Sequence, residues 1–167
     1  MNLHNLKKHF PWMTLVLLAL FVGILDPNFL RLENLIDLAG DISTLFIMAL
    51  GITFVIYIGS IDLSAQSVAN MITVLATLLL VHIGAFAAPV CIAIGALFGF
   101  VSGLVSTRFK VPSFIATLAV GGIALSVGQY ASGQKALYMD ATLREQAFGW
   151  MIGTTAGLPR EMIIALV

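Results

Sequence analysis

The sequence predicts an all-α, polytopic membrane protein with about five transmembrane helices and the start of a sixth. Of the 167 residues, 60% are hydrophobic and only 10% are charged, whereas soluble domains average about 25% charged residues. No Asp, Glu, Lys or Arg lies between Asp62 and Arg108, a stretch long enough for two spans. Because the bilayer interior offers no water to backbone groups, such apolar stretches must be helical.

Five apolar runs approach the roughly 20 residues that a spanning helix needs. They are residues 10–25, 43–61 (with 36–42 as a possible lead-in), 67–83, 86–107 and 112–131. Pro112 suits the first turn of the fifth run, because proline lacks the N–H group that would be unpaired there. Residues 131–160 are more polar, and we expect them outside the membrane.

The last seven residues, EMIIALV, begin a sixth apolar run. Seven residues cannot cross a bilayer. We therefore expect the chain to be a piece of a longer protein or a truncated product.

Basic residues orient the predicted spans. Lys7 and Lys8 precede the first run, and Arg108 and Lys110 follow the fourth. Since positively charged loops favour the cytoplasmic side, we expect a cytoplasmic N-terminus. The loop that contains Asp62 then lies on the cytoplasmic side as well. A formal net charge of zero argues against nucleic acid as a partner.

Signatures of catalysis are absent from the sequence, so we expect no enzyme activity, no catalytic residue and no cofactor. The segment GQYASGQK resembles a phosphate-binding loop, but Gln134 stands where the lysine belongs. His82 and Cys91 have no second ligand at metal spacing, so no metal site is expected.

The segment YIGSIDLSAQS, residues 57–67, interrupts two apolar runs with a carboxylate and several small polar residues. Asp62 or Ser64 can cap the following helix by accepting hydrogen bonds from its first N–H groups. Alternatively, a carboxylate within a membrane segment is retained at a cost and indicates function, such as lining a water-filled route. Both interpretations remain open.

Gly95, Gly99 and Gly103 are spaced four residues apart and share one face of the fourth predicted helix. Such a face lets another helix approach closely, which predicts helix packing. The alternative is a glycine face that lines a pore.

Two motifs carry a family resemblance. MALGITFVIYIGSIDLSAQS resembles ALGMTLVIITGGIDLSVGS, and FKVPSFIATLAVGGIAL resembles RIPPFIATLGTMTILRG, of the inner-membrane permeases of sugar-type (ribose and xylose class) ABC importers. The resemblance extends over residues 26–167 and implies that residues 1–167 are the N-terminal part of a single permease transmembrane domain. Departures from the family pattern are Ser60, Ala65, Gln66, Leu125 and the pair Gly40 and Asp41.

The resemblance implies import of a monosaccharide by alternating access, powered by a separate ATPase. The implied partners are a second permease subunit, cytoplasmic subunits that bind the ATP, a periplasmic sugar-binding protein and membrane lipid. The implied location is the bacterial inner membrane. The residues expected along the route are Thr53, Tyr57, Ser60, Asp62, Ser64 and Gln66, and all of them except Asp62 are of a type that suits neutral sugars.

Two alternatives remain. The same superfamily includes permeases for branched-chain amino acids, nucleosides and autoinducer-2. The chain can also be a fragment that does not transport.

Overall fold

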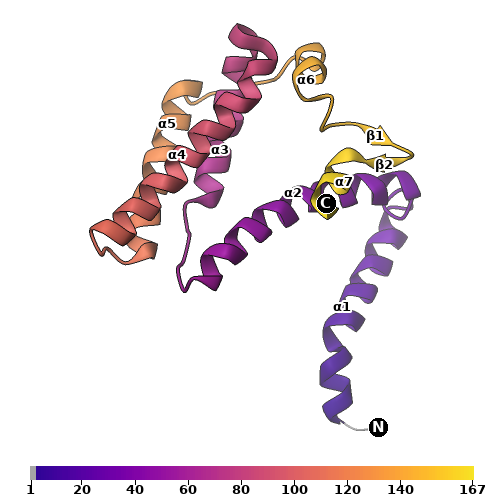
Figure 1. Cartoon of the computed structure of the whole chain (residues 1–167). Coiled ribbons are helices and arrows are strands. Elements are labelled where there is room, and N and C mark those ends of the chain that lie inside the picture. Colours follow the sequence, from indigo (N-terminus) through magenta and orange to yellow (C-terminus); the bar gives the residue numbers. More distant parts are fainter. Residues whose placement is uncertain (1–2) are drawn as a thin grey trace.

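The computed structural model describes the backbone of residues 3–167 and the side chains from residue 9 onward. Helices dominate the described chain (Figure 1). They are α1 (Leu3–Leu25), α2 (Leu32–Tyr57), α3 (Ala65–Ile83), α4 (Ala87–Arg108), α5 (Ser113–Ser132), α6 (Ala141–Phe148) and α7 (Arg160–Leu166), with a 3-10 turn η1 (Gly84–Phe86). The only departure from the all-α prediction in the described chain is the antiparallel pair β1 (Thr154–Thr155) and β2 (Leu158–Pro159).

Within the described residues, three helical stretches are long and apolar enough to cross a membrane: Leu32–Tyr57, Ala65–Arg108 and Ser113–Ser132. The second of these contains α3, η1 and α4, and the chain reverses at η1, so that α4 packs along α3. The apolar part of α1, His9–Leu25, is shorter. The prediction of a helical membrane protein with several spans is therefore confirmed.

The C-terminal end of α2 differs from the prediction. We expected this helix to continue to Ile61, but it ends at Tyr57. Gly59 has a φ of +75°, the Ser60 N–H group bonds the Val55 carbonyl at 3.0 Å, and the Gly59 N–H group bonds the Ile56 carbonyl at 2.9 Å. These two bonds form a Schellman motif, which stops a helix at a residue that tolerates positive φ.

The helices form two groups (Figure 1). α3, α4 and α5 pack against one another in a bundle, whereas α2 packs against α7 and β2. Gly40 of α2 lies against β2, because a Cβ added there comes within 3.3 Å of Pro159. α1 extends away from both groups.

The contact between α3 and α5 is the closest in the bundle and depends on two glycines of α5. A Cβ added at Gly121 lies 3.2 Å from the Cα of Ser64, and one added at Gly128 lies 3.2 Å from the Cα of Met71. Between them Ala124 is completely buried. Because lipid is as apolar as the side chains, close van der Waals packing of this kind is what holds membrane helices together.

Candidate functional site

The site begins with the non-helical segment between α2 and α3, residues 58–64, which runs alongside the first two turns of α5. Its Ile61 backbone pairs with Ser113, its Leu63 backbone pairs with Thr117, and Ser64 lies against Gly121. Ser113 and Gly121 are eight residues apart, or about 12 Å along a helix. The segment therefore extends well past the beginning of a spanning helix instead of forming a loop beyond it.

Two hydroxyl groups of α5, which we call the hydroxyl clamp (Ser113 and Thr117), hold this segment. Ser113 Oγ accepts a hydrogen bond from the Ile61 N–H group at 3.0 Å. Thr117 Oγ1 accepts one from the Leu63 N–H group at 3.1 Å. The same Oγ1 lies 3.3 Å from the carbonyl oxygens of Ile61 and Phe114, either of which can accept its proton.

The clamp provides hydrogen-bonding partners for backbone groups that the membrane interior would leave unpaired. Non-helical backbone at membrane depth is tolerated only where protein groups or a water-filled cavity satisfy it. Ser113 and Thr117 lie one turn apart in α5, so they face the same side. α5 begins at Ser113, one residue later than predicted, so Pro112 is its N-cap and does not lie in the first turn. The Pro112 carbonyl accepts from the N–H groups of Ile115 and Ala116.

Asp62 stabilises the turn that leads into α3. Its Oδ1 accepts hydrogen bonds from the Ser64 N–H group at 2.7 Å and from the Ser64 hydroxyl at 2.6 Å, which makes an Asx turn. Ser64 occupies the N-cap position of α3 but makes no side-chain cap hydrogen bond. The expected helix cap by Asp62 or Ser64 is therefore wrong, because the carboxylate bonds the residue before the helix.

A cavity of about 200 Å³ lies between residues 55–62, α4 and the start of α5. Its surface is mostly apolar, but six of the lining residues carry hydroxyl groups: Ser60, Ser102, Ser106, Thr107, Ser113 and Thr117. Among the described residues, none hydrogen-bonds the Ser60 hydroxyl or Asp62 Oδ2, so these two groups are free to meet water or solute. In this conformation the cavity is smaller than the roughly 300–1,000 Å³ of typical small-molecule sites.

The structure brings together three of the six predicted pathway residues. Ser60 and Asp62 line the cavity, and Ser64 is buried beside them. The others, Thr53, Tyr57 and Gln66, are exposed on the helices to either side. Thr53 donates its hydroxyl proton to the Ala49 carbonyl of its own helix at 2.7 Å.

The predicted packing glycines of α4 make few contacts within this chain. A Cβ added at Gly95 comes within 3.9 Å of Ile72, whereas one added at Gly99 or Gly103 meets no described atom within 4 Å. Gly99 and Gly103 instead line the cavity. Helix packing against these two glycines stays a prediction, and it requires a partner beyond the described chain.

The sequence patterns did not predict the residues that pack α3 against α5 or the residues that hold segment 58–64. The signal for packing is a series of small residues in α5: Thr117, Gly121, Ala124 and Gly128, all buried. The signal for the clamp is that its hydrogen bonds join the two motifs that carry the family resemblance, IDLS and PSFIATL. Each motif supplies the other's hydrogen-bonding partners.

Outside the spans, Asp140 caps α6. Its Oδ1 accepts from the N–H groups of Thr142 and Leu143, at 2.9 and 3.2 Å, and from the Thr142 hydroxyl. The hydrogen bond from the Thr142 hydroxyl and those from the two N–H groups lower the pKa of Asp140. Across the described residues, no three His, Cys, Asp or Glu side chains are grouped to hold a metal ion.

Comparison with known proteins adds a family. A family described as the permease component of branched-chain amino acid transport systems matches residues 34–166. The ribose import permease protein of Escherichia coli is 33% identical over 153 residues, which cover 90% of this chain and 47% of that protein. The ribose import permease protein of Haemophilus influenzae is 35% identical over 109 residues, 64% of this chain and 34% of that protein.

The autoinducer 2 import system permease protein of Escherichia coli is 29% identical over 148 residues, which cover 86% of this chain and 43% of that protein. The chain thus spans about half the length of the curated relatives it matches. No solved structure matches it.

Proposed function

Because the chain belongs to the family of branched-chain amino acid transport system permease components, we propose that it is the permease component of a binding-protein-dependent ABC importer for a monosaccharide. Such permeases carry solutes across membranes and are not enzymes. The similarity to two ribose import permeases supports the choice of a sugar. Substrate passes inward by alternating access, and a separate cytoplasmic ATPase supplies the energy.

The observation that carries this proposal is the non-helical segment 58–64 held beside α5 by the hydroxyl clamp. Transporters build their sites from interrupted helices, where unwound backbone lines a cavity near the middle of the membrane. Here the interruption brings Asp62 and Ser60 to a cavity whose lining includes six hydroxyl-bearing residues. Hydroxyl groups suit a neutral, polyhydroxylated solute better than fixed charges do.

The route proposed from the sequence runs through this segment: Thr53, Tyr57, Ser60, Asp62, Ser64 and Gln66. In the proposed orientation α1 to α5 are the five spans, the N-terminus is cytoplasmic, and the protein resides in the inner membrane. Gly95, Gly99 and Gly103 remain proposed as a helix-packing face, and a second permease subunit is one of the proposed partners. The other proposed partners are cytoplasmic ATP-binding subunits and a periplasmic sugar-binding protein.

Uptake of labelled ribose and xylose tests this proposal. The recipient cells lack their own ribose permease but keep its ATPase and binding protein. They receive either the chain itself or the chain joined to the part of the Escherichia coli ribose permease that it does not cover. Uptake by either form supports sugar import, while failure of both with every solute tried supports a fragment that does not transport.

Substitutions in the form that transports then test the route. Asp62→Asn keeps an oxygen that can accept from Ser64, so it removes the charge and preserves the turn. Gln66→Ala removes an amide, and Glu145→Gln is the matched control, since Glu145 is exposed on α6. We expect the first two to lower uptake or affinity and the control to leave both unchanged. Unchanged uptake and affinity in both route variants refutes the assignment.

A second candidate is import of autoinducer-2, favoured by the 29% identity to the permease that carries that name. Adding autoinducer-2 to the uptake measurements separates the two, because a sugar permease prefers ribose or xylose when both classes compete.

A further inference from the structure

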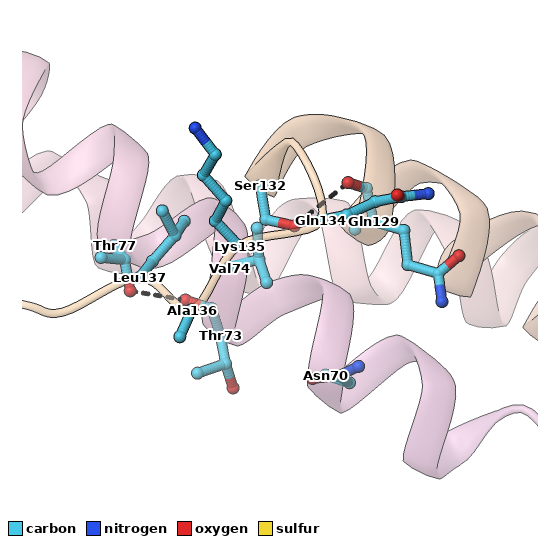
Figure 2. Close-up of a pocket in the computed structure, with 11 residues that line it drawn as sticks. Asn70, Thr73, Val74, Thr77, Gln129, Ser132, Gln134, Lys135, Ala136 and Leu137 are labelled. Carbon is cyan, nitrogen blue, oxygen red and sulfur yellow. Dashed lines mark hydrogen bonds between the residues drawn. The ribbon is translucent and has the colours of Figure 1, made fainter.

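A second cavity, of about 510 Å³, lies between α3 and the end of α5, away from the site described above. Figure 2 shows Asn70, Thr73 and Thr77 of α3 on one side of it and Gln129 and Ser132 of α5 on the other. Residues 134–137, which follow α5, form its third side. The volume falls within the range of about 300–1,000 Å³ that holds small molecules in proteins.

Three amide side chains face this cavity with their hydrogen-bonding groups free. No side chain or backbone group that the structure describes forms a hydrogen bond with the side-chain amide of Asn70, Gln129 or Gln134. Each amide offers two donors and one acceptor carbonyl. Asn70 lies within an apolar spanning stretch, where an unpaired polar group is costly and indicates a pathway or a site. The cavity therefore suits water or a ligand that forms hydrogen bonds.

The hydroxyl groups add to this character. Thr73 and Thr77 donate to carbonyls of their own helix, at Ala69 (3.0 Å) and Thr73 (2.9 Å). Their oxygens keep lone pairs that accept from a ligand. Alternating donors and acceptors of this kind match the hydroxyl groups of a polyol, each of which also donates and accepts.

The charge around the cavity disfavours cationic and zwitterionic ligands. Among the described residues no carboxylate lines it, and the only charged lining residue is Lys135. Figure 2 shows the Lys135 side chain extending away from the two helices. A zwitterion such as an amino acid would find no partner for its ammonium group here, whereas a neutral solute needs none.

The backbone holds the third side in place. Gly133 and Gln134 both adopt left-handed conformations, with φ of +59°. The Gln134 N–H group bonds the Gln129 carbonyl at 3.0 Å, and the Gly133 N–H group bonds the Tyr130 carbonyl at 3.1 Å. A left-handed non-glycine residue is strained, and such strain is concentrated at functional sites. The turn directs residues 134–137 back over the cavity.

We infer that the cavity between α3 and the end of α5 binds a neutral, polyhydroxylated small molecule of the monosaccharide class through Asn70, Gln129 and Gln134. The ligand class rests on the proposed sugar import. The site itself lies on the far side of the closely packed glycine contacts from segment 58–64, so it adds a second point on the route.

Cysteine labelling tests this inference without requiring transport. Val74→Cys and Ala136→Cys, at lining positions that bind no ligand in this proposal, are made in the chain, whose single natural cysteine, Cys91, is buried and gives the background. Membrane fragments, in which both faces are accessible to the reagent, are treated with a charged, water-soluble maleimide in the presence of D-ribose, D-xylose or leucine. Gln146→Cys, on the exposed surface of α6, is the matched control.

We expect both cavity cysteines to react, because the cavity contains water. Saturating ribose or xylose slows their labelling at least about threefold, the change expected when a bound ligand occupies the site two-thirds of the time or more. Leucine has no effect, and Gln146→Cys labels at the same rate throughout. Absence of labelling at both positions overturns the inference, since the cavity then faces lipid or another helix. Labelling that no sugar slows, or that leucine slows equally, overturns it as well.

The uptake measurements keep the two proposals separable. Protection without uptake by any form of the chain refutes the proposed transport and leaves the binding site standing. Uptake without protection refutes the site alone. Where uptake occurs, Asn70→Leu raises the apparent KM for sugar several-fold, about the effect of one lost hydrogen bond, and Gln146→Leu leaves it unchanged.

Discussion

Removal of the Thr117 hydroxyl tests whether the clamp stabilises the fold. Thr117→Val keeps the shape of this buried side chain and removes both of its hydrogen-bonding functions. The Leu63 N–H group then has no acceptor, and the Ile61 carbonyl loses a donor. Each unpaired buried group costs about 1–3 kcal/mol. Because Ile61 and Leu63 are about half exposed, water replaces part of each lost bond, and we expect a total loss of about 1–3 kcal/mol.

Thermal unfolding in detergent measures this loss. Cys91 is 6% exposed and is the only cysteine of the chain, so a thiol-reactive dye reports its exposure as the bundle opens. At about 2–4 °C per kcal/mol for chains of 150–250 residues, the midpoint falls by about 2–12 °C.

Thr14→Val is the matched control, because the Thr14 hydroxyl bonds only the Phe10 carbonyl of its own helix. That carbonyl keeps its helical partner, so a change of less than about 0.5 kcal/mol is expected. Thr117→Ser keeps a hydroxyl and should recover most of the lost stability. Equal midpoints for Thr117→Val and Thr14→Val refute the clamp.

Three further predictions follow from the same contacts. Gly128→Ala forces α3 and α5 apart at Met71, because the new Cβ would lie 3.2 Å from the Met71 Cα. The dye-reported unfolding midpoint should fall by the equivalent of about 1–3 kcal/mol. Gly122→Ala is the control and leaves the midpoint unchanged, because its new Cβ meets no atom within 4 Å. Asp62→Ala removes the Asx turn and lowers the free energy of unfolding by about 0.5–1.5 kcal/mol. Asp62→Asn keeps the turn and should leave the unfolding midpoint unchanged. Equal losses of stability in the two variants would show that the charge of Asp62 matters and the turn geometry does not. The pKa of Asp140 is lowered in the folded protein from a usual 3.8. Its stabilisation of α6 is therefore fully present above that value and disappears as the pH falls through the folded pKa. Hydrogen exchange of the α6 amides, corrected for intrinsic rates, should accelerate in that pH window in the parent chain and show no such step in Asp140→Asn.

The sequence predicted the existence of the long helices well, because apolar runs of that length have no other stable conformation in lipid. It missed the end of α2, since residues 58–61 include two isoleucines and read as a continuation of the apolar run. The backbone conformation of Gly59, which hydropathy does not encode, decides where this helix ends.

Packing partners were harder to predict than helices. In a membrane every face of a helix is apolar, so hydrophobicity does not distinguish a lipid-facing side from a buried one. Glycine spacing in α4 pointed to Gly99 and Gly103, whereas the close contacts use Gly121 and Gly128 of α5.

The candidate site was found in part. Asp62 and Ser60 stood out because they are polar in an apolar context, but Ser113 and Thr117 did not. Hydroxyl residues in helices usually bond the carbonyl one turn earlier, as Thr53 does here. A bond to a segment more than 50 residues away in sequence leaves no local pattern to detect.

The tight reversal at η1 has a consequence for how the chain enters the membrane. α3 and α4 are joined by three residues, Gly84–Phe86, and no Asp, Glu, Lys or Arg lies between Asp62 and Arg108. A helical hairpin of this kind can be inserted as one unit during synthesis, because moving its tip across carries none of the roughly 2.5–3.5 kcal/mol cost of a charged residue. Both ends of the hairpin then lie on one face of the bilayer. Segment 58–64 and the start of α5 are therefore delivered to the same side of the bilayer before their hydrogen bonds form.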